Sequence, residues 1–186
     1  MMNRDMTISQ RVTRAADSCE LEKVLATHNY LHAASRSYEE WTTVWSKRED
    51  TSWAHSFGRM RGFPSIWMGS VVDYDQQCID NYRQIEANYP EVAGMDYRPL
   101  YNNAMHTLTN GVLEVADNGK TARASYLTPG LLYSFLNDDQ KPWGAMLWER
   151  YGMDFVKEED GWKFLHYQVC PEFFDLFDVF NPAEMM

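Results

Sequence analysis

The spacing of apolar residues predicts that the chain begins with a long helix. Over residues 8–35 the apolar side chains recur every three or four positions, as at Leu21, Leu25 and Leu31, which is the period of one helix face. His28 falls on the same face, and charged residues lie near one end of the opposite face. We therefore expect this helix to bury one side against a core.

A second helix is predicted to start at Ser37. Ser37 and Glu40 have the spacing of a capping box, in which each side chain hydrogen-bonds the backbone N–H of the other residue. Trp41, Val44 and Trp45 follow at helical spacing. These three side chains should form the buried stripe of the helix.

The next segments alternate between regular and irregular structure. A short strand is expected at about 51–57, followed by a loop at 58–69 that Gly and Pro interrupt. A third helix should run over 70–88 and end before Pro90, because the residue before a proline disfavours helical geometry. Residues 91–103 form an irregular segment, and a loop of this length is often functional.

Strands dominate the second half of the chain. They are expected at about 104–115, 121–136, 143–157 and 162–170, and short polar turns separate them, so neighbouring strands should be antiparallel. The Pro-Gly pair at 129–130 predicts a bulge or bend in the second of these strands. Helices followed by an antiparallel meander indicate an α+β fold.

We expect a single domain over residues 1–186. Residues 1–19 would extend the first helix at its N-terminal end. The tail at 171–186 is rich in aromatic residues. It is expected to close over a pocket as a lid or to contact another subunit.

Charge and cysteine content argue against several kinds of partner and site. The formal net charge of the 186 residues is −10, whereas nucleic-acid phosphates and anionic membranes attract a basic face. Three widely spaced cysteines favour neither a disulfide framework nor a paired metal site. No secretory signal or membrane-spanning stretch is recognisable, so a cytoplasmic protein is expected. Aromatic residues make up 15% of the chain, which suits a pocket for a flat ligand as well as a core.

Three segments carry a resemblance to a known family. Residues 30–57 have a helix–turn–helix–strand pattern, residues 105–127 a His-bearing strand with a turn and a small-residue strand, and residues 151–169 a charged turn followed by Gly-Trp-Lys. In this order they resemble the SnoaL-like and scytalone dehydratase-like branch of the nuclear transport factor 2-like superfamily. The resemblance implies an α+β fold in which a curved antiparallel sheet wraps around N-terminal helices as a cone, a cystatin-like roll that encloses a ligand.

The same resemblance implies a range of activities. Many members are dehydratases, isomerases, cyclases or retro-aldol lyases that use neither a metal nor an organic cofactor, and others only bind a ligand or assemble subunits. It also implies a homodimer or homotrimer. The fold alone does not decide among these activities, so the side chains must be considered.

His106 is the first candidate for catalysis. The resemblance places a cavity-facing catalytic histidine at this strand position, and an imidazole can take up and return a proton near neutral pH. By strand alternation Asn110 shares its face. His55 could act as the acid opposite this base, unless the register turns Trp53 inward and His55 outward. For both histidines the alternative is a strand residue that hydrogen-bonds a neighbour.

Tyrosines and one arginine extend the expected site. Tyr30 matches a tyrosine that family members direct into the pocket, where a phenol could stabilise an enolate-like oxygen; alternatively it is a core residue. Arg36 and Ser37 stand where the scytalone dehydratase pattern has a Tyr-Asp pair, and Arg36 could meet a carboxylate or phenolate. Tyr133 and Tyr151 fall near the second histidine and the asparagine of that pattern, so both could supply phenolic donors.

Three other histidines have less specific positions. His166 follows Trp162 and Phe164 at strand spacing, so it lines the pocket or is a satisfied core residue. His28 and His32 lie one helical turn apart, a spacing that can ligate a metal, but no third ligand stands at motif spacing. We expect them to be structural, with at most one reaching the cavity, and we expect no metal or other cofactor. The remaining residues expected to line the pocket are Tyr101, Tyr126 and Trp148.

These observations predict a cofactor-independent lyase, either a dehydratase or a retro-aldol carbon–carbon lyase, that acts on a small aromatic or polycyclic substrate. His106 would move the proton, and Tyr30, Tyr133 or Tyr151 would hold the developing oxyanion. Two alternatives stay open. One is an isomerase or cyclase of a ring ketone in the same pocket, and the other is a non-catalytic protein that binds a small molecule or assembles subunits.

Overall fold

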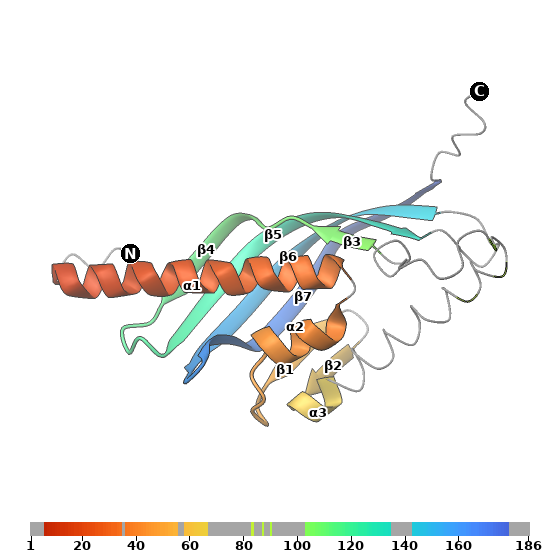
Figure 1. Cartoon of the computed structure of the whole chain (residues 1–186). Helices are drawn as coiled ribbons and strands as arrows, with labels where there is room; N and C mark the ends of the chain where they lie inside the picture. The colour runs from red at the N-terminus through yellow and green to blue at the C-terminus, as the bar shows by residue number, and fades with distance from the viewer. Residues whose placement is uncertain are drawn as a thin grey trace.

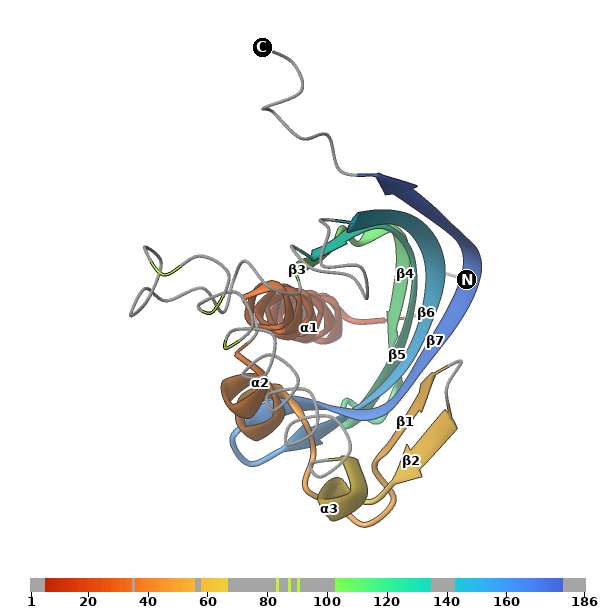
Figure 2. The ribbon, with the colours of Figure 1, turned by 90° about the vertical axis from the view of Figure 1, so that its right-hand side faces the viewer.

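A curved sheet wraps around one long helix in the computed structural model of the chain (Figure 1). Viewed along this helix, α1, the strands curve around it, so that α1 lies on the concave side of the sheet (Figure 2). The residues described are 6–34, 36–55, 58–66, 83, 87, 90, 103–134 and 143–178.

The first helix, α1 (Ile8–Ala33), confirms the prediction for this segment. The Thr7 side chain accepts the N–H of Gln10, and the Gln10 side chain accepts the N–H of Thr7. This capping box satisfies two N–H groups that have no partner within the helix. No helix among the described residues has the length and apolar character that a membrane crossing requires.

The second helix, α2 (Ser37–Val44), also lies where it was predicted, but its expected capping box is absent. Arg36 is the N-cap residue, and its side chain makes no capping hydrogen bond. Ser37 and Glu40 are both buried, and Glu40 is directed at His28 of α1. The Ser-x-x-Glu spacing is compatible with either arrangement, so the packing of α2 on α1 decides between them.

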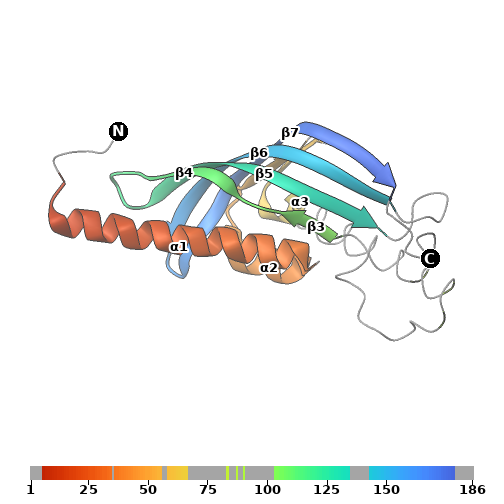
Figure 3. The same ribbon diagram turned by 90° about the horizontal axis from the view of Figure 1, so that it is seen from above.

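The described residues form a sheet of seven strands, in the order β2-β1-β7-β6-β5-β3, with β4 also paired to β5. Every pair is antiparallel except β1 with β7, which confirms the predicted antiparallel meander of the second half. Figure 3 shows from above how the long strands cross over α1. The strands are β1 (Ser52–His55), β2 (Gly58–Arg61), β3 (Asn103–His106), β4 (Thr109–Val115), β5 (Thr121–Ser134), β6 (Trp143–Glu158) and β7 (Gly161–Asp178).

Two predicted segments differ from the structure. The expected loop at 58–69 contains β2, which forms a hairpin with β1, and the short helix α3 (Phe63–Ile66). The last strand does not end near residue 170, because β7 pairs with β6 as far as Asp178. The first half of the tail that was expected to be a lid or an interface therefore continues the sheet.

Other predictions fall on parts of the chain that the structure does not describe. The third helix expected at 70–88 and the loop at 91–103 lie almost wholly outside the described residues, and so does the end of the tail, 179–186. The predicted strand at 104–115 is described, and it consists of two strands, β3 and β4, that pair with successive parts of β5.

The predicted bulge at Pro129-Gly130 is absent, because β5 pairs with β6 through these residues without a shift. The interruption lies in the neighbouring strand. The carbonyl of Pro129 accepts the N–H of Thr107, at 3.1 Å, between β3 and β4. The backbone N and O of a residue in an antiparallel strand point to the same neighbouring strand. The nitrogen of Pro129 therefore points to the break between β3 and β4, where no sheet hydrogen bond requires an N–H from it.

A bulge in β7 changes which residues face the interior. Phe155 of β6 pairs with Phe164, but the preceding Asp154 pairs with His166, so Leu165 is an extra residue. An extra residue reverses the alternation of side chains beyond it. Phe164 therefore faces inward before the bulge and Tyr167 faces inward after it.

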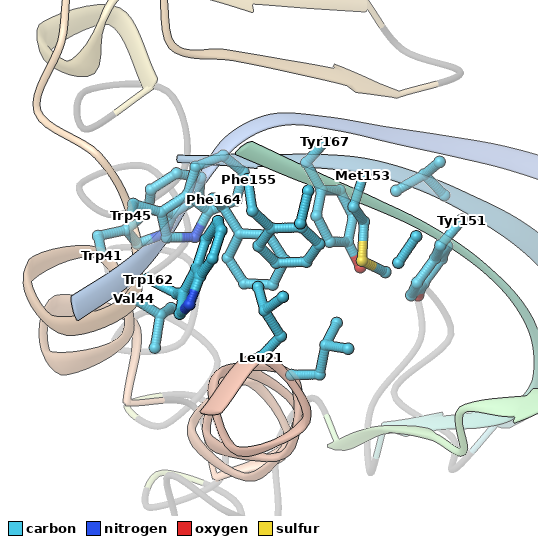
Figure 4. Close-up of a cluster of buried hydrophobic side chains, with 14 of the residues drawn as sticks. Leu21, Trp41, Val44, Trp45, Tyr151, Met153, Phe155, Trp162, Phe164 and Tyr167 are labelled. Carbon is cyan, nitrogen blue, oxygen red and sulfur yellow. The ribbon is translucent and has the colours of Figure 1, made fainter. Parts of the chain in front are cut away.

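Aromatic side chains fill the space between the helices and the sheet (Figure 4). The Trp41 and Trp45 rings of α2 stack with centroids 4.1 Å apart, and Trp45 contacts the fully buried Phe164. Leu21 and Leu25 of α1 complete this core. The core holds α1 against the sheet and thereby positions the polar residues of its following turns.

Gly111 is expected to tolerate no side chain, because the Tyr126 ring lies over it. A Cβ at this position would stand 2.0 Å from Cε1 of Tyr126, so the ring would have to leave its place against the core. Gly111→Ala should lower the free energy of unfolding by about 1–3 kcal/mol, as measured by urea denaturation. In a Tyr126→Leu background the same substitution should cost much less; an equal cost in both backgrounds would contradict this explanation.

Candidate active site

His106, at the end of β3, lies beside two polar residues of β6. Its Nδ1 is 3.0 Å from the Tyr151 hydroxyl and 3.4 Å from Oε2 of Glu149. Glu149 and Tyr151 are two residues apart in the strand, so both project from the buried face. The Asn29 side chain of α1 donates to the His106 carbonyl at 3.3 Å, which ties the end of β3 to the helix.

The hydrogen bonds of this group determine which imidazole nitrogen carries the proton. The Tyr151 hydroxyl donates to Oε2 of Glu149 at 2.9 Å, so its oxygen is left to accept from His106. We infer that Nδ1 of His106 carries the proton and donates to Tyr151. Nε2 then holds the lone pair, and none of the described residues hydrogen-bonds it. This is the arrangement of a general base held by a second group.

Burial keeps the His106 imidazole uncharged. It lowers the pKa of His106 to about 3, and the charges of His32 and His28 contribute in the same direction. Burial also raises the pKa of Glu149, against the hydrogen bond from Tyr151 and the charge of His32, which lower it. His106 is therefore neutral, and able to accept a proton, across the physiological pH range.

A second polar cluster surrounds Glu40 of α2. Oε1 of Glu40 is 2.8 Å from Nδ1 of His28 and accepts the indole N–H of Trp45 at 3.4 Å. Its other oxygen is 3.4 Å from Nδ1 of His32. On its far side the His28 ring reaches the Tyr167 hydroxyl, at 3.2 Å from Nε2. Two histidines one turn apart on α1 thus share one buried carboxylate.

The charges in the Glu40 cluster support one another. Burial alone would raise the pKa of Glu40, but the charge of His28 and hydrogen bonds from His28 and His32 lower it to about 2. Burial would lower the pKa of His32, but the hydrogen bond and charge of Glu40, together with the charge of Glu149, raise it. At neutral pH Glu40 is ionised, and His32 is more strongly protonated than a free histidine.

The two clusters meet on the concave side of the sheet. The rings of His32 and His106 have centroids 5.8 Å apart, and those of Tyr151 and Tyr167 are 5.2 Å apart. The side chain of His32 is 37% exposed and that of His106 is 9% exposed. A neutral imidazole and a histidine whose protonated form a carboxylate stabilises therefore face the same region.

His55 and Trp53 of β1 lie on the same face, with ring centroids 5.6 Å apart. Both residues were expected to line the pocket, and the alternative register with Trp53 inward and His55 outward was wrong, because side chains two residues apart project from the same side of a strand. Trp53 also contacts Trp41 of the core. Burial lowers the pKa of His55, and the charge of His32 lowers it further, so His55 lies within the influence of the cluster.

Tyr30 and Arg36 do not reach this region. Tyr30 is 71% exposed, because the inward face of α1 is occupied by Leu25, His28 and Leu31. The predicted inward position of Tyr30 was therefore wrong. The guanidinium of Arg36 is paired with Glu39 of α2 on the surface, so Arg36 is also not a pocket residue.

Asn110 and Trp148 were also wrongly expected to face the pocket. The pairing of β4 with β5 shifts between Thr109 and Val112, and Asn110 has a φ of 48°. The regular alternation of side chains, which would place Asn110 on the same face as His106, is therefore interrupted at this point. Asn110 is exposed. Trp148 is 43% exposed, because the neighbouring Glu149 takes the inward position in β6.

His166 lies on the outer face, so the prediction that it faces inward was wrong. Because Leu165 is an extra residue in β7, the alternation of side chains reverses there, and His166 points to the opposite side of the sheet from Phe164. Its Nδ1 is 3.2 Å from a carboxylate oxygen of Asp154, and its Nε2 is 3.2 Å from the Asp50 carbonyl. It lines a surface hollow with Arg59 and Arg123.

The remaining predicted pocket residues have different outcomes. Tyr126 is half-buried and packs against the core, on the same face of β5 as the buried Ala124 and Thr128. Tyr101 and the side chain of Tyr133 lie outside what the structure describes. Their roles stay predictions.

Sequence reasoning missed three members of the two clusters. Glu149 could have been found, because it precedes Tyr151 by two residues and shares its strand face. Glu40 was interpreted as a capping residue, because its spacing from Ser37 is that of a capping box. Tyr167 carried no signal, since its inward direction depends on the bulge at Leu165. Among the described residues, no group of three or more His, Cys, Asp or Glu is arranged to hold a metal ion.

Acid should destabilise the folded protein through His106. Its pKa is about 3 in the folded state against an ordinary value of 6.5, so between these values the unfolded state binds more protons. The stabilisation present above pH 6.5 is lost as the pH falls toward 3, by about 2–3 kcal/mol at pH 4. Urea denaturation at pH 7, 5 and 4 should show this loss, and His106→Gln should reduce it. An identical pH dependence in both proteins would contradict it.

Comparison with known proteins supplies the context for this site. No protein-family model and no curated protein sequence matches the chain. Solved structures match it along most of its length. A protein of Novosphingobium aromaticivorans provisionally named a scytalone dehydratase is 12% identical, with a TM-score of 0.62 over 91% of this chain and 93% of its own.

Two other structures give the same result. The LinA-type3 hexachlorocyclohexane dehydrochlorinase of Novosphingobium barchaimii is 12% identical, with a TM-score of 0.58 over 92% of this chain and 99% of its own. An NTF2-like protein with a cystatin-like fold from Novosphingobium aromaticivorans is 16% identical, with a TM-score of 0.58 over 92% of both chains. The predicted fold class is thereby confirmed, and the chain has the nuclear transport factor 2-like fold, an α+β cone whose curved sheet wraps around its N-terminal helices.

Proposed function

We propose that the chain is a lyase that removes a small molecule from an aromatic or polycyclic substrate, with His106 as the general base. The observation that carries this proposal is the group formed by His106, Tyr151 and Glu149. It presents an uncharged imidazole with its lone pair on Nε2, buried in a region that His32 and His55 also line. At neutral pH this Nε2 can take a proton from a carbon next to a carbonyl, and the Tyr151–Glu149 pair at Nδ1 would stabilise the imidazolium that forms, which burial alone disfavours.

In a dehydration, Nε2 of His106 would take a proton from that carbon. The electron pair of the C–H bond would form a new carbon–carbon double bond, and hydroxide would leave the adjacent carbon with the C–O bonding pair. Hydroxide takes up the proton that His106 removed, which forms water as the second product and returns His106 to its neutral state. Glu149 and Tyr151 would act as positioning residues, since they hold Nδ1 of His106 rather than the substrate.

The structural comparisons support this reaction class. A dehydratase name and a dehydrochlorinase name both denote removal of a small molecule, water or hydrogen chloride, from the substrate. The ring of Trp53, whose centroid lies 5.6 Å from that of His55, would provide an apolar surface for a ring substrate. A subunit number of two or three stays a prediction.

The experiment is a screen of the purified protein against ring ketones that carry a hydroxyl group in a side chain, on the carbon next but one to the carbonyl. Mass spectrometry of the products distinguishes the possible activities. A product lighter by one water supports a dehydratase, and cleavage into two fragments supports a retro-aldol lyase. Conversion at constant mass would favour an isomerase or cyclase instead. Thermal stabilisation by a compound without conversion would favour a binding protein and overturn the proposal.

A further inference from the structure

His32 is not a member of the base group formed by His106, Tyr151 and Glu149, although its charge lowers the pKa of His106. Its Nδ1 is directed at Glu40, which is almost completely buried. A buried carboxylate is stable only when donors and positive charge surround it. Trp45 donates to Glu40 without charge, whereas His32 lies 3.4 Å from Glu40, which raises the pKa of His32, so His32 is a source of positive charge beside this carboxylate.

The two histidines are not equivalent. His28 is buried, and both of its nitrogens are engaged, one with Glu40 and the other with the Tyr167 hydroxyl. His32 lies one turn further along α1, and 37% of its side chain is exposed. Of the two histidines that contact Glu40, His32 is therefore the one that can place a positive charge where a ligand could meet it.

Charged and titratable groups from five elements surround His32. They are His28 of α1, Glu40 of α2, His55 of β1, His106 of β3 and Glu149 of β6. Glu40 and Glu149 are the acidic groups among them. Glu149 lies behind His106, whose Nδ1 is 3.4 Å from its Oε2, so the charge of Glu149 is partly covered from this region by the imidazole ring.

We propose that this region binds an oxygen anion of the enolate or phenolate type, with His32 as its positively charged hydrogen-bond donor. This inference rests on the proposed function, because loss of a proton to His106 next to a carbonyl creates such an anion. It adds the residue that would stabilise the anion and the class of ligand that would carry it, a ring compound with a phenol or a ketone.

The geometry fits a ligand that contacts both histidines. A carbon at Nε2 of His106 and an oxygen at His32 each need an approach of about 3 Å. Rings whose centroids are 5.8 Å apart can both make that approach to one small molecule. A cationic donor in a partly desolvated site stabilises a developing oxyanion far more than water does.

The ligand is expected to enter as a neutral phenol or ketone, because it becomes an anion only when it loses a proton in the site. Once its proton is lost, the negative charge is balanced by His32.

The test uses 4-nitrophenol, which enters neutral and whose phenolate form absorbs visible light. The probe is titrated into the full chain at a pH below that at which free 4-nitrophenol is half ionised. The wild-type protein should bind it as the phenolate and increase its visible absorbance. His32→Gln should weaken phenolate binding by about 10- to 100-fold, the range for loss of one charged hydrogen bond. His32→Lys, which restores the charge, should recover most of the ionisation.

Controls separate this result from misfolding and from failure of the proposed reaction. Tyr30→Phe changes an exposed residue of the same helix and should leave binding unchanged, and circular dichroism checks the fold of each variant. If His32→Gln does not fold, NMR of the wild-type histidine rings replaces it, and the His32 signals should move when the phenol is added. Absence of binding, binding as the neutral phenol, wild-type phenolate binding by His32→Gln, or unmoved His32 signals would each overturn the inference. The probe binds without being converted, so the two proposals can fail separately. Phenolate binding can be observed when no compound of the screen is converted, and a compound can be converted when no phenolate binding is observed.

Discussion

Replacement of His106 by Gln should lower kcat by about 10²–10⁴-fold, the contribution that a general base makes to proton transfer. Glutamine preserves the approximate size of the side chain and can still hydrogen-bond Tyr151, but it cannot accept a proton from carbon. Steady-state kinetics on the substrate found in the screen would measure the effect. The loss should appear in kcat and in kcat/KM alike, because the interaction is made in the transition state.

His166→Gln is the matched control for this experiment. It makes the same chemical change on the outer face of the sheet, where His166 is bonded to Asp154 and to the Asp50 carbonyl. This variant should keep wild-type kinetics. Wild-type turnover in His106→Gln would remove His106 from the mechanism, even if the fold and the reaction class were right.

Replacement of Glu40 by Ala should lower the free energy of unfolding by about 3–5 kcal/mol, the usual cost of removing one partner from a buried charged pair. Glu40 accepts from Trp45 and lies within 3.4 Å of a nitrogen of both His28 and His32. Alanine leaves these donors without an acceptor and opens a space between α1 and α2. Urea denaturation measures the loss, which should lower Tm by about 10 °C or more in a chain of this size.

Glu39 provides the comparison for Glu40 within the same helix. Its carboxylate is paired with Arg36 on the surface, where an ion pair contributes at most about 1 kcal/mol. Glu39→Ala should therefore change stability by less than 1 kcal/mol. Equal losses in the two variants would show that the Glu40 cluster does not hold α2 on α1.

The Glu40 substitution also connects stability with the charge in the site. Glu40 raises the pKa of His32 by hydrogen bonding and by its charge. A raised pKa stabilises the folded state below the ordinary value of 6.5 and ceases to do so as the pH rises through the folded value. Removal of Glu40 should thus reduce the fraction of protonated His32 at neutral pH and weaken phenolate binding as well.

Sequence patterns predicted some residues of the candidate site correctly and others wrongly. His106 and Tyr151 were expected from their positions in segments that resemble a known family, and the structure brings them within 3.0 Å. Their roles in catalysis stay proposals. His166 and Asn110 were assigned by unbroken alternation, and a single extra residue in each strand turned them outward. A bulge depends on the pairing of two strands, so the period of one strand cannot reveal it.

The amino-acid sequence by itself determined the two helices, the antiparallel meander and the fold class, because apolar periodicity and turn residues act over short distances along the chain. Only the tertiary structure decided that Glu40 meets the histidines of α1 and that His106 meets Glu149. Glu40 and His28 are 12 residues apart, and Tyr151 and His106 are 45 apart. Such contacts depend on how α2 packs on α1 and how β3 and β6 both align with β5. Burial keeps His106 neutral, whereas the Glu40 carboxylate raises the pKa of His32 against the effect of burial.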